Sequence, residues 1–366
     1  MTVCSETVPM FIVSYNGLES LGSTFLKVVE KAVVASTYMD NIKVILIDNG
    51  SKDKSADIVQ ERFWDTVTLL RLKSNLGHSG GVNVDLKRYI TITGSTPRYA
   101  FVMDNDYAIV NPDGLRDLIR YMEGNRGTAA LQDINLNSYG KVSDVGLLLT
   151  TLHTVIFRCG GLPVGEYPEK VSYVSSVINC LALYNVRLIL LKREFMFNRY
   201  NIIYHDDVDL SLDMWSHGYP SAFIPVVVGV HYWSSTRKRM IKSIIEYESK
   251  RGAVLLYKRL SKFVKAKGLL TPYVRELLYT VPRLVLYGRE RTSIVTRAFL
   301  DAMSLKVKPL TRPYEPLLLH MSLKALPYSF IWSRLKHEKR SELMKLVIDK
   351  DTLRTSRRPF IISYTL

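Results

Sequence analysis

The stretch FVMDNDYAIV, residues 101–110, begins as an apolar run and then breaks into acid, amide and acid at Asp104, Asn105 and Asp106. The apolar residues before Asp104 predict a strand buried inside a sheet. On a continuing strand, the two carboxylates would point to the same face. Such a pair can hold a hard divalent cation, but Asp and Asn are also frequent in solvated turns after strands. These residues alone leave both interpretations open.

Short apolar runs alternate with helical patterns around this stretch. Strands are expected at 10–13, 44–47, 67–72 and 100–103, and helices at 18–36, 56–63, 81–92 and 114–122. This alternation predicts an α/β fold with a Rossmann-like, mostly parallel sheet. Ligands bind at the carboxyl ends of such strands. Beyond residue 130 the pattern is less regular, with strands expected at 145–149 and 222–228.

Composition and charge divide the chain. Its 366 residues are 47% hydrophobic and 23% charged, which indicates a globular protein long enough for two domains. Residues 232–366 hold 29 Lys or Arg and 10 Asp or Glu, whereas residues 1–231 carry a net charge of −3. We therefore predict an α/β domain over 1–235 and a basic, mainly helical region over 236–366.

The location of the protein is predicted from its cysteines and its apolar runs. Three scattered cysteines indicate a reducing compartment. The sequence begins without the features of a secretory signal, and its longest uncharged run contains Gly and Pro. These observations predict a cytoplasmic protein that does not span a membrane.

Two further stretches could contact a nucleotide. In VILIDNGSKDKS, residues 44–55, the carboxylate of Asp48 could accept hydrogen bonds from a nucleobase, while Ser51 or Asp53 could cap the next helix. In NLGHSGGVN, residues 75–83, three glycines allow a tight turn close to a ligand, and the following helix offers free N–H groups to an anion. A purely structural glycine turn is a serious alternative.

A third acidic stretch, YHDDVDLSLDMW at residues 204–215, contains Asp206, Asp207 and Asp209. Carboxylates this close repel one another, so at least one is expected to have a raised pKa, which suits a general base. An acidic helix start that complements the helix dipole explains the same residues. His231 follows the apolar run FIPVVVGV, where a lone His is more often structural than a metal ligand.

In this order, and at roughly this spacing, the stretches resemble family 2 inverting glycosyltransferases with the GT-A fold, especially the rhamnosyl- and galactofuranosyl-transferase branch. The resemblance covers about residues 8–255 and is carried by FIVSYNG (first strand), LIDNGSKDKS (Asp-Asn-x-Ser-x-Asp), NLGHSGGVN (glycine-rich motif), MDNDY (Asp-x-Asp), HDDVDLSL (Glu-Asp-x-Asp-Leu), VGVHYWSS (late metal-ligand histidine) and YESKRG (Tyr-x-x-x-Arg-Asn). The chain departs from the family pattern at Asp206 for Glu, Asp85 for Gly and Gly252 for Asn.

The resemblance implies transfer of a hexosyl or rhamnosyl group, with inversion, from a UDP- or dTDP-linked sugar to a hydroxyl of a glycan or lipid-linked acceptor. It implies Mn²⁺ or Mg²⁺ as the metal and Asp207 as the general base. The implied metal ligands are Asp104, Asp106 and His231. The residues implied to bind the nucleotide sugar are Ser14, Tyr15, Asn16, Asp48, Asn75, Gly81, Asn83 and Asp104.

The basic region suggests a further partner. The segment TRKRMIKSIIEYESKRGAVLLYKRLSKFVKAK, residues 236–267, mixes basic with apolar residues. As a helix it could lie on an anionic membrane surface, which would make the protein peripheral to the membrane. Its apolar stripe could equally pack on the α/β domain. The rival function is a non-catalytic nucleic-acid-binding protein, but a basic tract explains none of the acidic motifs, so nucleic acid is not the expected partner.

Overall fold

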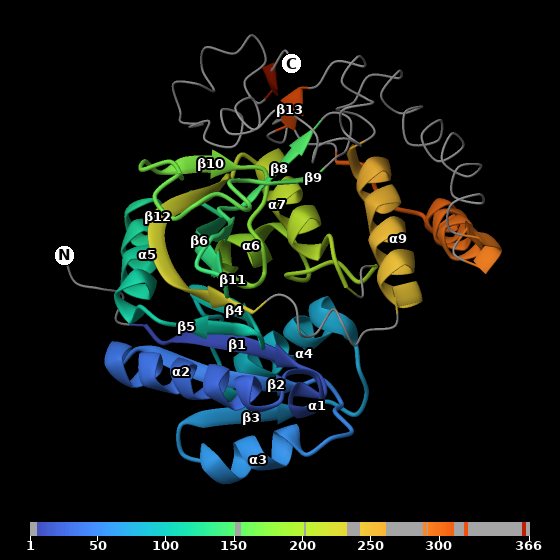
Figure 1. The fold of residues 1–366 in the computed structure, drawn as a ribbon. Coiled ribbons are helices and arrows are strands. Elements are labelled where there is room, and N and C mark those ends of the chain that lie inside the picture. The colour runs from blue at the N-terminus through green and yellow to red at the C-terminus, as the bar shows by residue number, and fades with distance from the viewer. Residues whose placement is uncertain are drawn as a thin grey trace.

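The computed structural model of the chain describes residues 6–150, 155–200, 203–232, 242–260, 288–290, 292–310, 318–320 and 361–363. Within these ranges a ten-stranded sheet forms the centre of the molecule (Figure 1). Its strands are β1 (Val8–Ser14), β2 (Ile42–Asp48), β3 (Val67–Arg71), β4 (Tyr99–Asp104), β5 (Tyr107–Ile109), β6 (Ala130–Asn137), β7 (Val142–Asp144), β10 (Ser172–Val174), β11 (Leu181–Asn185) and β12 (Ser221–His231).

The main path of the sheet runs in the order β10-β12-β6-β11-β4-β1-β2-β3, with β5 paired to β12 and β7 to β6. Strands β3, β2, β1 and β4 are parallel to one another. Strand β11 is antiparallel to both β4 and β6, and β12 is parallel to β6. The predicted α/β class with a mostly parallel sheet is confirmed.

Helices cover both faces of this sheet. The helices of the α/β part are α1 (Gly17–Leu21), α2 (Ser23–Met39), α3 (Ser55–Arg62), α4 (Gly77–Thr93), α5 (Pro112–Gly124), α6 (Val186–Lys192) and α7 (Asp206–Ser216). Strand β4 alternates between two hydrophobic clusters: Phe101 packs with α2 and α5, and Val102 packs with α4 and α6. Because both faces of β4 are buried, the run of residues before Asp104 is almost entirely apolar.

Each strand and helix predicted before residue 130 has a counterpart in the structure, with shifted ends, but the single helix expected over 18–36 is divided at Gly22 into α1 and α2. The largest shift is in α4, which begins at Gly77 rather than at Gly81. The glycine-rich stretch is therefore not a free loop before the helix but the first turns of the helix itself. The strands expected at 145–149 and 222–228 correspond to β8 (Leu147–Thr150) and β12.

The basic region packs on the α/β part through α9 (Lys242–Leu260). Leu256 and Leu260 of α9 share a hydrophobic cluster with Val208 and Leu212 of α7. On another side of α9, a helix over 292–304 contributes Ala302 to a second cluster (Figure 1). Several apolar side chains of α9 that were candidates for a membrane surface are therefore buried inside the protein, whereas Ile244 of the same helix is exposed.

The described part of residues 236–366 is not wholly helical. Strand β13 (Leu318–His320) pairs with β8 and with β14 (Ile361–Ser363), in a second sheet that also contains β9 (Val155–Phe157). The predicted boundary at 235–236 lies outside the described residues.

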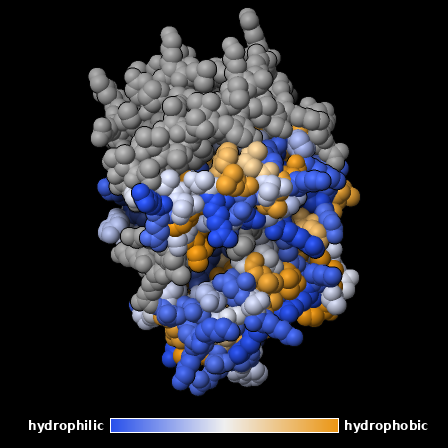
Figure 2. All heavy atoms as spheres, turned by 90° about the vertical axis from the view of Figure 1, so that its right-hand side faces the viewer, coloured by the Kyte–Doolittle hydropathy of each residue, from blue (hydrophilic) through white to orange (hydrophobic). Residues whose placement is uncertain are grey.

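No helix among the described residues combines the length and apolar character needed to cross a membrane. Figure 2, which views the right-hand side of Figure 1, shows hydrophilic and apolar side chains interspersed over the coloured part of this face.

Candidate functional site

Three parallel strands end in polar residues at the same edge of the sheet. Ser14 at the end of β1 is in register with Asp48 at the end of β2. On the other side of β1, Val13 is in register with Asp104 at the end of β4. The carboxyl ends of these strands therefore bring Ser14, Asp48 and Asp104 together, as expected for a ligand-binding edge.

Asp104, Asp106 and His231 form a group that fits a divalent cation. Each offers one ligand atom, and the three atoms lie within 4.8 Å of one another. Asp106 and His231 are buried, and the His231 Nε2 lies 3.1 Å from the Asp106 Oδ1. Two carboxylate oxygens and one imidazole nitrogen are suitable ligands for Mn²⁺ and acceptable ones for Mg²⁺. The predicted ligand set is thus assembled in three dimensions.

The pairing of β5 with β12 explains how a histidine 125 residues away reaches Asp106. His231 is opposite Tyr107 in this antiparallel pair, and the backbone N–H of Tyr232 donates to the Asp106 carbonyl at 2.8 Å. Gly229 allows the two strands to come close, because a Cβ there would lie 2.3 Å from the Ala108 carbonyl oxygen. Gly229, two residues before His231 in the stretch VGVHYWSS, therefore sets the geometry of the group.

His78 connects the metal group to α7, and the sequence analysis missed its role. Its Nδ1 lies 2.8 Å from the Asp206 Oδ2, and its Nε2 lies 3.8 Å from the Asp104 Oδ1. Burial opposes the charged imidazole, but the carboxylates of Asp206, Asp104 and Asp207 outweigh it and raise the pKa of His78 to about 9. The only signal in the sequence was its place inside the glycine-rich stretch.

The three carboxylates at the start of α7 have different partners. Asp206 pairs with His78 and accepts a hydrogen bond from the Ser79 hydroxyl at 3.0 Å. Asp209 pairs with Arg259 at 2.7 Å and with Arg193 at 3.3 Å. Burial tends to raise the pKa of both carboxyls. The cationic partners and hydrogen bonds outweigh this effect and bring each pKa below its usual value, so both carboxyls stay ionised at neutral pH.

Asp207 is the exception among the three. Within the described part of the chain, its carboxylate has no cationic partner in contact. Burial and the neighbouring Asp206 raise its pKa to about 8, although the backbone N–H groups of Val208 and Asn179 oppose this shift. The expectation that one of the three carboxyls has a raised pKa is met at the residue that the resemblance implied as the base.

The predicted donor-binding residues at the ends of β1 and β2 lie together. Ser14 is buried, and its hydroxyl accepts a hydrogen bond from the Asn105 amide at 3.1 Å. Asp48 is also buried and accepts from the Ser51 backbone N–H at 3.0 Å. Asn16 has a left-handed backbone with φ 49°, and its side chain accepts from the Lys52 backbone N–H at 2.8 Å. Tyr15 between them is exposed.

Of the two candidates for capping α3, Asp53 accepts a hydrogen bond from the backbone N–H of Ser55, the first residue of the helix, at 3.0 Å. Lys54 occupies the N-cap position, and its own side chain makes no capping hydrogen bond. The Ser51 hydroxyl instead accepts from the Asn16 backbone N–H at 2.9 Å, and Asp53 accepts from the N–H groups of Ser55 and Glu19. Ser51 and Asp53 thus connect the loop after β2 to the segment after β1, where the backbone N–H groups of Asn16 and Glu19 need acceptors.

Asn49 and Asn75 explain why α4 starts early. The Asn49 amide accepts from the Leu76 N–H and donates to the Gly77 carbonyl, both at 2.9 Å. Asn75 accepts from the Gly77 N–H at 2.8 Å. Gly81 faces β1 and β2, where a Cβ would make only ordinary contacts, so packing within the chain does not require glycine there.

The side chain of Asn83, another residue predicted to bind the donor, makes hydrogen bonds within the chain. Its amide donates to the Phe197 carbonyl at 2.8 Å and accepts from the Phe197 N–H at 3.0 Å. The Phe197 ring in turn lies edge-on to His78, with ring centroids 5.8 Å apart. Asn83 therefore supports the surroundings of His78.

The three departures from the family pattern are each accommodated within the chain. Asp206 is paired with His78 as described. Asp85 is buried in α4, where it pairs with Arg88 at 3.2 Å, and burial raises its pKa to about 7. Gly252 of α9 lies against His205.

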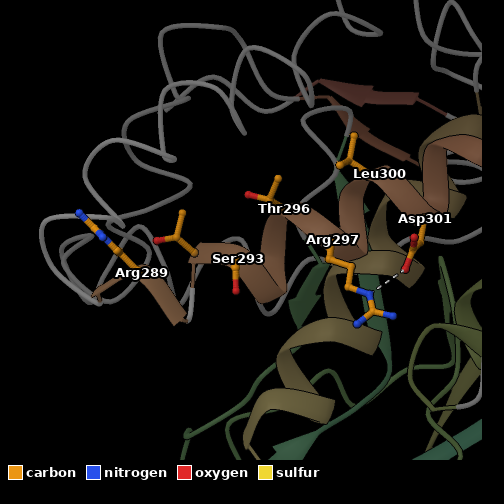
Figure 3. A pocket seen from close by; sticks show the side chains of 7 residues that line it. Arg289, Ser293, Thr296, Arg297, Leu300 and Asp301 are labelled. Carbon is orange, nitrogen blue, oxygen red and sulfur yellow. Dashed lines mark ion pairs between the residues drawn. The ribbon is translucent and has the colours of Figure 1, made fainter.

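A pocket of about 540 Å³ lies elsewhere, along the helix over 292–304 (Figure 3). It is lined by Arg289, Thr292, Ser293, Thr296, Arg297, Leu300 and Asp301. The pocket contains none of the predicted site residues, and its Arg297 is paired with Asp301 at 3.8 Å. It is therefore separate from the group at the edge of the sheet.

A comparison with models of protein families matches the first part of the chain. Residues 10–158, less than half of the 366, match the family model described as Glycosyl transferase family 2. This segment contains Asp48, the glycine-rich stretch, Asp104 and Asp106, but not Asp207 or His231. None of the curated proteins compared with the chain matches it.

Several solved structures are similar at low sequence identity. The mannosyltransferase PcManGT from Pyrobaculum calidifontis, in complex with GDP-Man and Mn²⁺, is 15% identical, with 92% of this chain and 84% of that chain covered and a TM-score of 0.49. TarS 1–349 from S. aureus is 15% identical, with 81% of each chain covered and a TM-score of 0.49. GalNAc-T7 with UDP, GalNAc and Mn²⁺ is 12% identical, with 81% and 56% covered and a TM-score of 0.48.

Proposed function

We propose that this protein is a metal-dependent inverting glycosyltransferase of the GT-A type. It would move a sugar from a nucleoside-diphosphate sugar to a hydroxyl of a glycan or lipid-linked acceptor. One observation carries the proposal. His78 lies between a group of metal-ligand type (Asp104, Asp106 and His231) and the acidic start of α7, where Asp207 has no cationic partner among the residues that the structure describes. The family match over residues 10–158 supports it independently.

The donor would bind along the carboxyl edge of β1, β2 and β4. Asp48 is suited to accept hydrogen bonds from a base, and Ser14, Tyr15 and Asn16 are suited to the ribose side. Asn75 and Gly81 belong to the start of α4, whose N-terminus favours phosphate groups. We propose a UDP- or dTDP-linked sugar, with a hexosyl, rhamnosyl or galactofuranosyl group.

Asp104, Asp106 and His231 would hold the Mn²⁺ or Mg²⁺ ion. When bound, this ion supplies positive charge that stabilises the departing nucleoside diphosphate. The residues of the chain have the remaining tasks. Burial of Asp106 and His231 excludes water from this side of the site, and the pairing of β5 with β12 keeps the two side chains together.

Asp207 would take the proton from the acceptor hydroxyl as this oxygen attacks the anomeric carbon. The new C–O bond forms on the face opposite the breaking bond to the diphosphate, so the configuration inverts. Asp206 and Asp209 are less suited to this role, because their ion pairs with His78, Arg193 and Arg259 make them weak bases. A raised pKa makes Asp207 a stronger base than a solvent-exposed Asp.

The test is binding and transfer with defined donors. Calorimetry with UDP and with dTDP should show binding in the presence of Mn²⁺ and much weaker binding in EDTA. A panel of nucleotide sugars should then show metal-dependent hydrolysis or transfer with at least one donor. Equal nucleotide affinity with and without metal would contradict the metal assignment, and no turnover of any donor would contradict the proposed activity.

A further inference from the structure

The turn that leads into α7 has an unusual backbone. Tyr204 and His205, two consecutive residues with side chains, have φ values of 66° and 62°. This left-handed region is uncommon for any residue except Gly, although Asn, Asp and His adopt it more often than most, and two such residues in succession need support from the surrounding structure. Asp206 and Asp207 follow directly as the first residues of α7. The conformation of this turn therefore determines where the proposed base lies.

Helix α9 supplies contacts that hold the turn. The His205 Nε2 donates a hydrogen bond to the Ser249 carbonyl of α9 at 3.0 Å, since the carbonyl can only accept. Close by in α9, the ring lies against Gly252, where a Cβ would be only 2.7 Å from the His205 Cδ2. Nearby, Arg251 donates to the Tyr200 carbonyl at 2.6 Å. The imidazole of His205 thus packs against α9 at position 252, where any side chain larger than that of glycine would clash with the ring.

These contacts give a reason for one departure from the family pattern. The resembling motif has Asn after Arg251, whereas this chain has Gly252. An Asn side chain at this position would meet the His205 ring through its Cβ. The residue pair His205 and Gly252 is mutually adapted, although 47 positions separate the two residues in the sequence.

We propose that His205 is a positioning residue for Asp207 and that α9, through Ser249 and Gly252, completes the active site by fixing this turn. The inference rests on the proposed function, in which Asp207 acts on the acceptor hydroxyl. A misplaced base slows the chemical step by about 100-fold for a displacement of about 1 Å. We expect donor binding to change less than kcat, because the turn reaches the metal-ligand group only indirectly, through Asp206 and His78.

The main test is Gly252→Ala, which adds one methyl group against the His205 ring. We expect kcat to fall about 10–100-fold, while the dissociation constant for UDP with Mn²⁺ changes much less. The matched control is Gly124→Ala, also in a helix, where an added Cβ meets no atom within 4 Å. Wild-type kcat in the Gly252 variant would overturn the inference.

Two His205 variants keep the test decisive if Gly252→Ala folds poorly. His205→Ala should lower kcat, and His205→Gln, whose amide can still donate to the Ser249 carbonyl, should recover part of the loss. Adding Gly252→Ala to His205→Ala should cause no further loss, because the ring that clashes is gone. Equal losses from Gly252→Ala in both backgrounds would show that His205 does not transmit the effect.

Amide hydrogen exchange separates failure of this inference from failure of the proposed function. The first helical hydrogen bond of α7 runs from the Asp209 N–H to the His205 carbonyl at 2.9 Å. Exchange in this turn should be faster in Gly252→Ala and unchanged in Gly124→Ala. Faster exchange in a protein whose wild type transfers no sugar would contradict the proposed function alone. Unchanged exchange and unchanged kcat, with an active wild type, would contradict the positioning role alone.

Discussion

The Nδ1 of His78 lies 2.8 Å from the Oδ2 of Asp206, and both side chains are largely excluded from solvent. The pair links the N-terminal turn of α4 to the N-terminal turn of α7, 128 residues later. Because the His78 Nε2 also faces Asp104, one imidazole stands between the metal-ligand group and the acidic start of α7. Its positive charge reduces the repulsion between these carboxylates.

Loss of this pair should destabilise the protein. In His78→Leu the Asp206 carboxylate is left buried without its cationic partner, so we expect the free energy of unfolding at pH 6 to fall by about 3 kcal/mol or more. Urea denaturation measures this change. The double variant His78→Leu with Asp206→Asn should be more stable than His78→Leu alone, because it buries no unpaired charge. Equal stability of the two variants would contradict a charged pair.

The same pair should make stability depend on pH. The pKa of His78 is about 9 in the folded protein and about 6.5 in the unfolded chain. The stabilisation it provides is therefore fully present below pH 6.5 and is lost as the pH rises through 9. The difference in unfolding free energy between wild type and His78→Leu should shrink over this interval, as measured by denaturation at several pH values. A constant difference would mean that His78 is not protonated.

Transfer should become faster with pH because Asp207 acts in its ionised form. With a pKa of about 8, the logarithm of kcat/KM for the acceptor should rise with unit slope below pH 8 and level off above it. Asp207→Asn should lose about 10²–10⁴-fold in rate while UDP binding with Mn²⁺ is retained. If this variant keeps wild-type turnover, another residue is the base.

Gly229 should control metal affinity although it binds no metal. In Gly229→Ala the new Cβ would be 2.3 Å from the Ala108 carbonyl oxygen, so β5 and β12 must separate and His231 must move from Asp106. We expect Mn²⁺ to bind about 10–100-fold more weakly, the range found when the support of a metal ligand is lost. Calorimetry in the presence of UDP measures this. Gly127→Ala, where a Cβ meets nothing within 4 Å, should bind Mn²⁺ normally.

The ion pairs of Arg259 should matter for stability, unlike an exposed pair in the same basic region. Arg259 is largely buried and pairs with Asp209 at 2.7 Å and with Asp213 at 3.3 Å. Arg259→Met should lower the unfolding free energy by about 3 kcal/mol. Arg297→Met, which removes an exposed pair with Asp301, should change it by less than about 1 kcal/mol. Thermal unfolding of the two variants side by side checks the contrast.

Membrane attachment, if the acceptor is lipid-linked, should be electrostatic. Residues 232–366 carry a net charge of +19, and each Lys or Arg near an anionic surface contributes about 1 kcal/mol. We expect co-sedimentation with anionic liposomes at low salt, weaker binding at high salt and none with neutral liposomes. Absence of pelleting with anionic liposomes at low salt would contradict this attachment and favour nucleic acid as the partner of the basic region.

The sequence by itself determined the α/β class, most of the order of the elements up to residue 130, and the edge at which the polar residues meet. These follow from local physics: the apolar period of strands and helices, and the rule that parallel strands end at one edge. The strand before Asp104 could be recognised because both of its faces are buried, which leaves hardly a polar residue in it.

Only the tertiary structure decided how the side chains at this edge are paired. Asp206, Asp207 and Asp209 look alike in the sequence, and they differ because His78, Arg193 and Arg259 reach two of them from other elements. The hydrogen bonds between Asn83 and Phe197 could not be read from the sequence, because 114 residues separate the two. Charge pairing and pKa depend on distances across the fold, and those distances are set by packing rather than by any local pattern of residues.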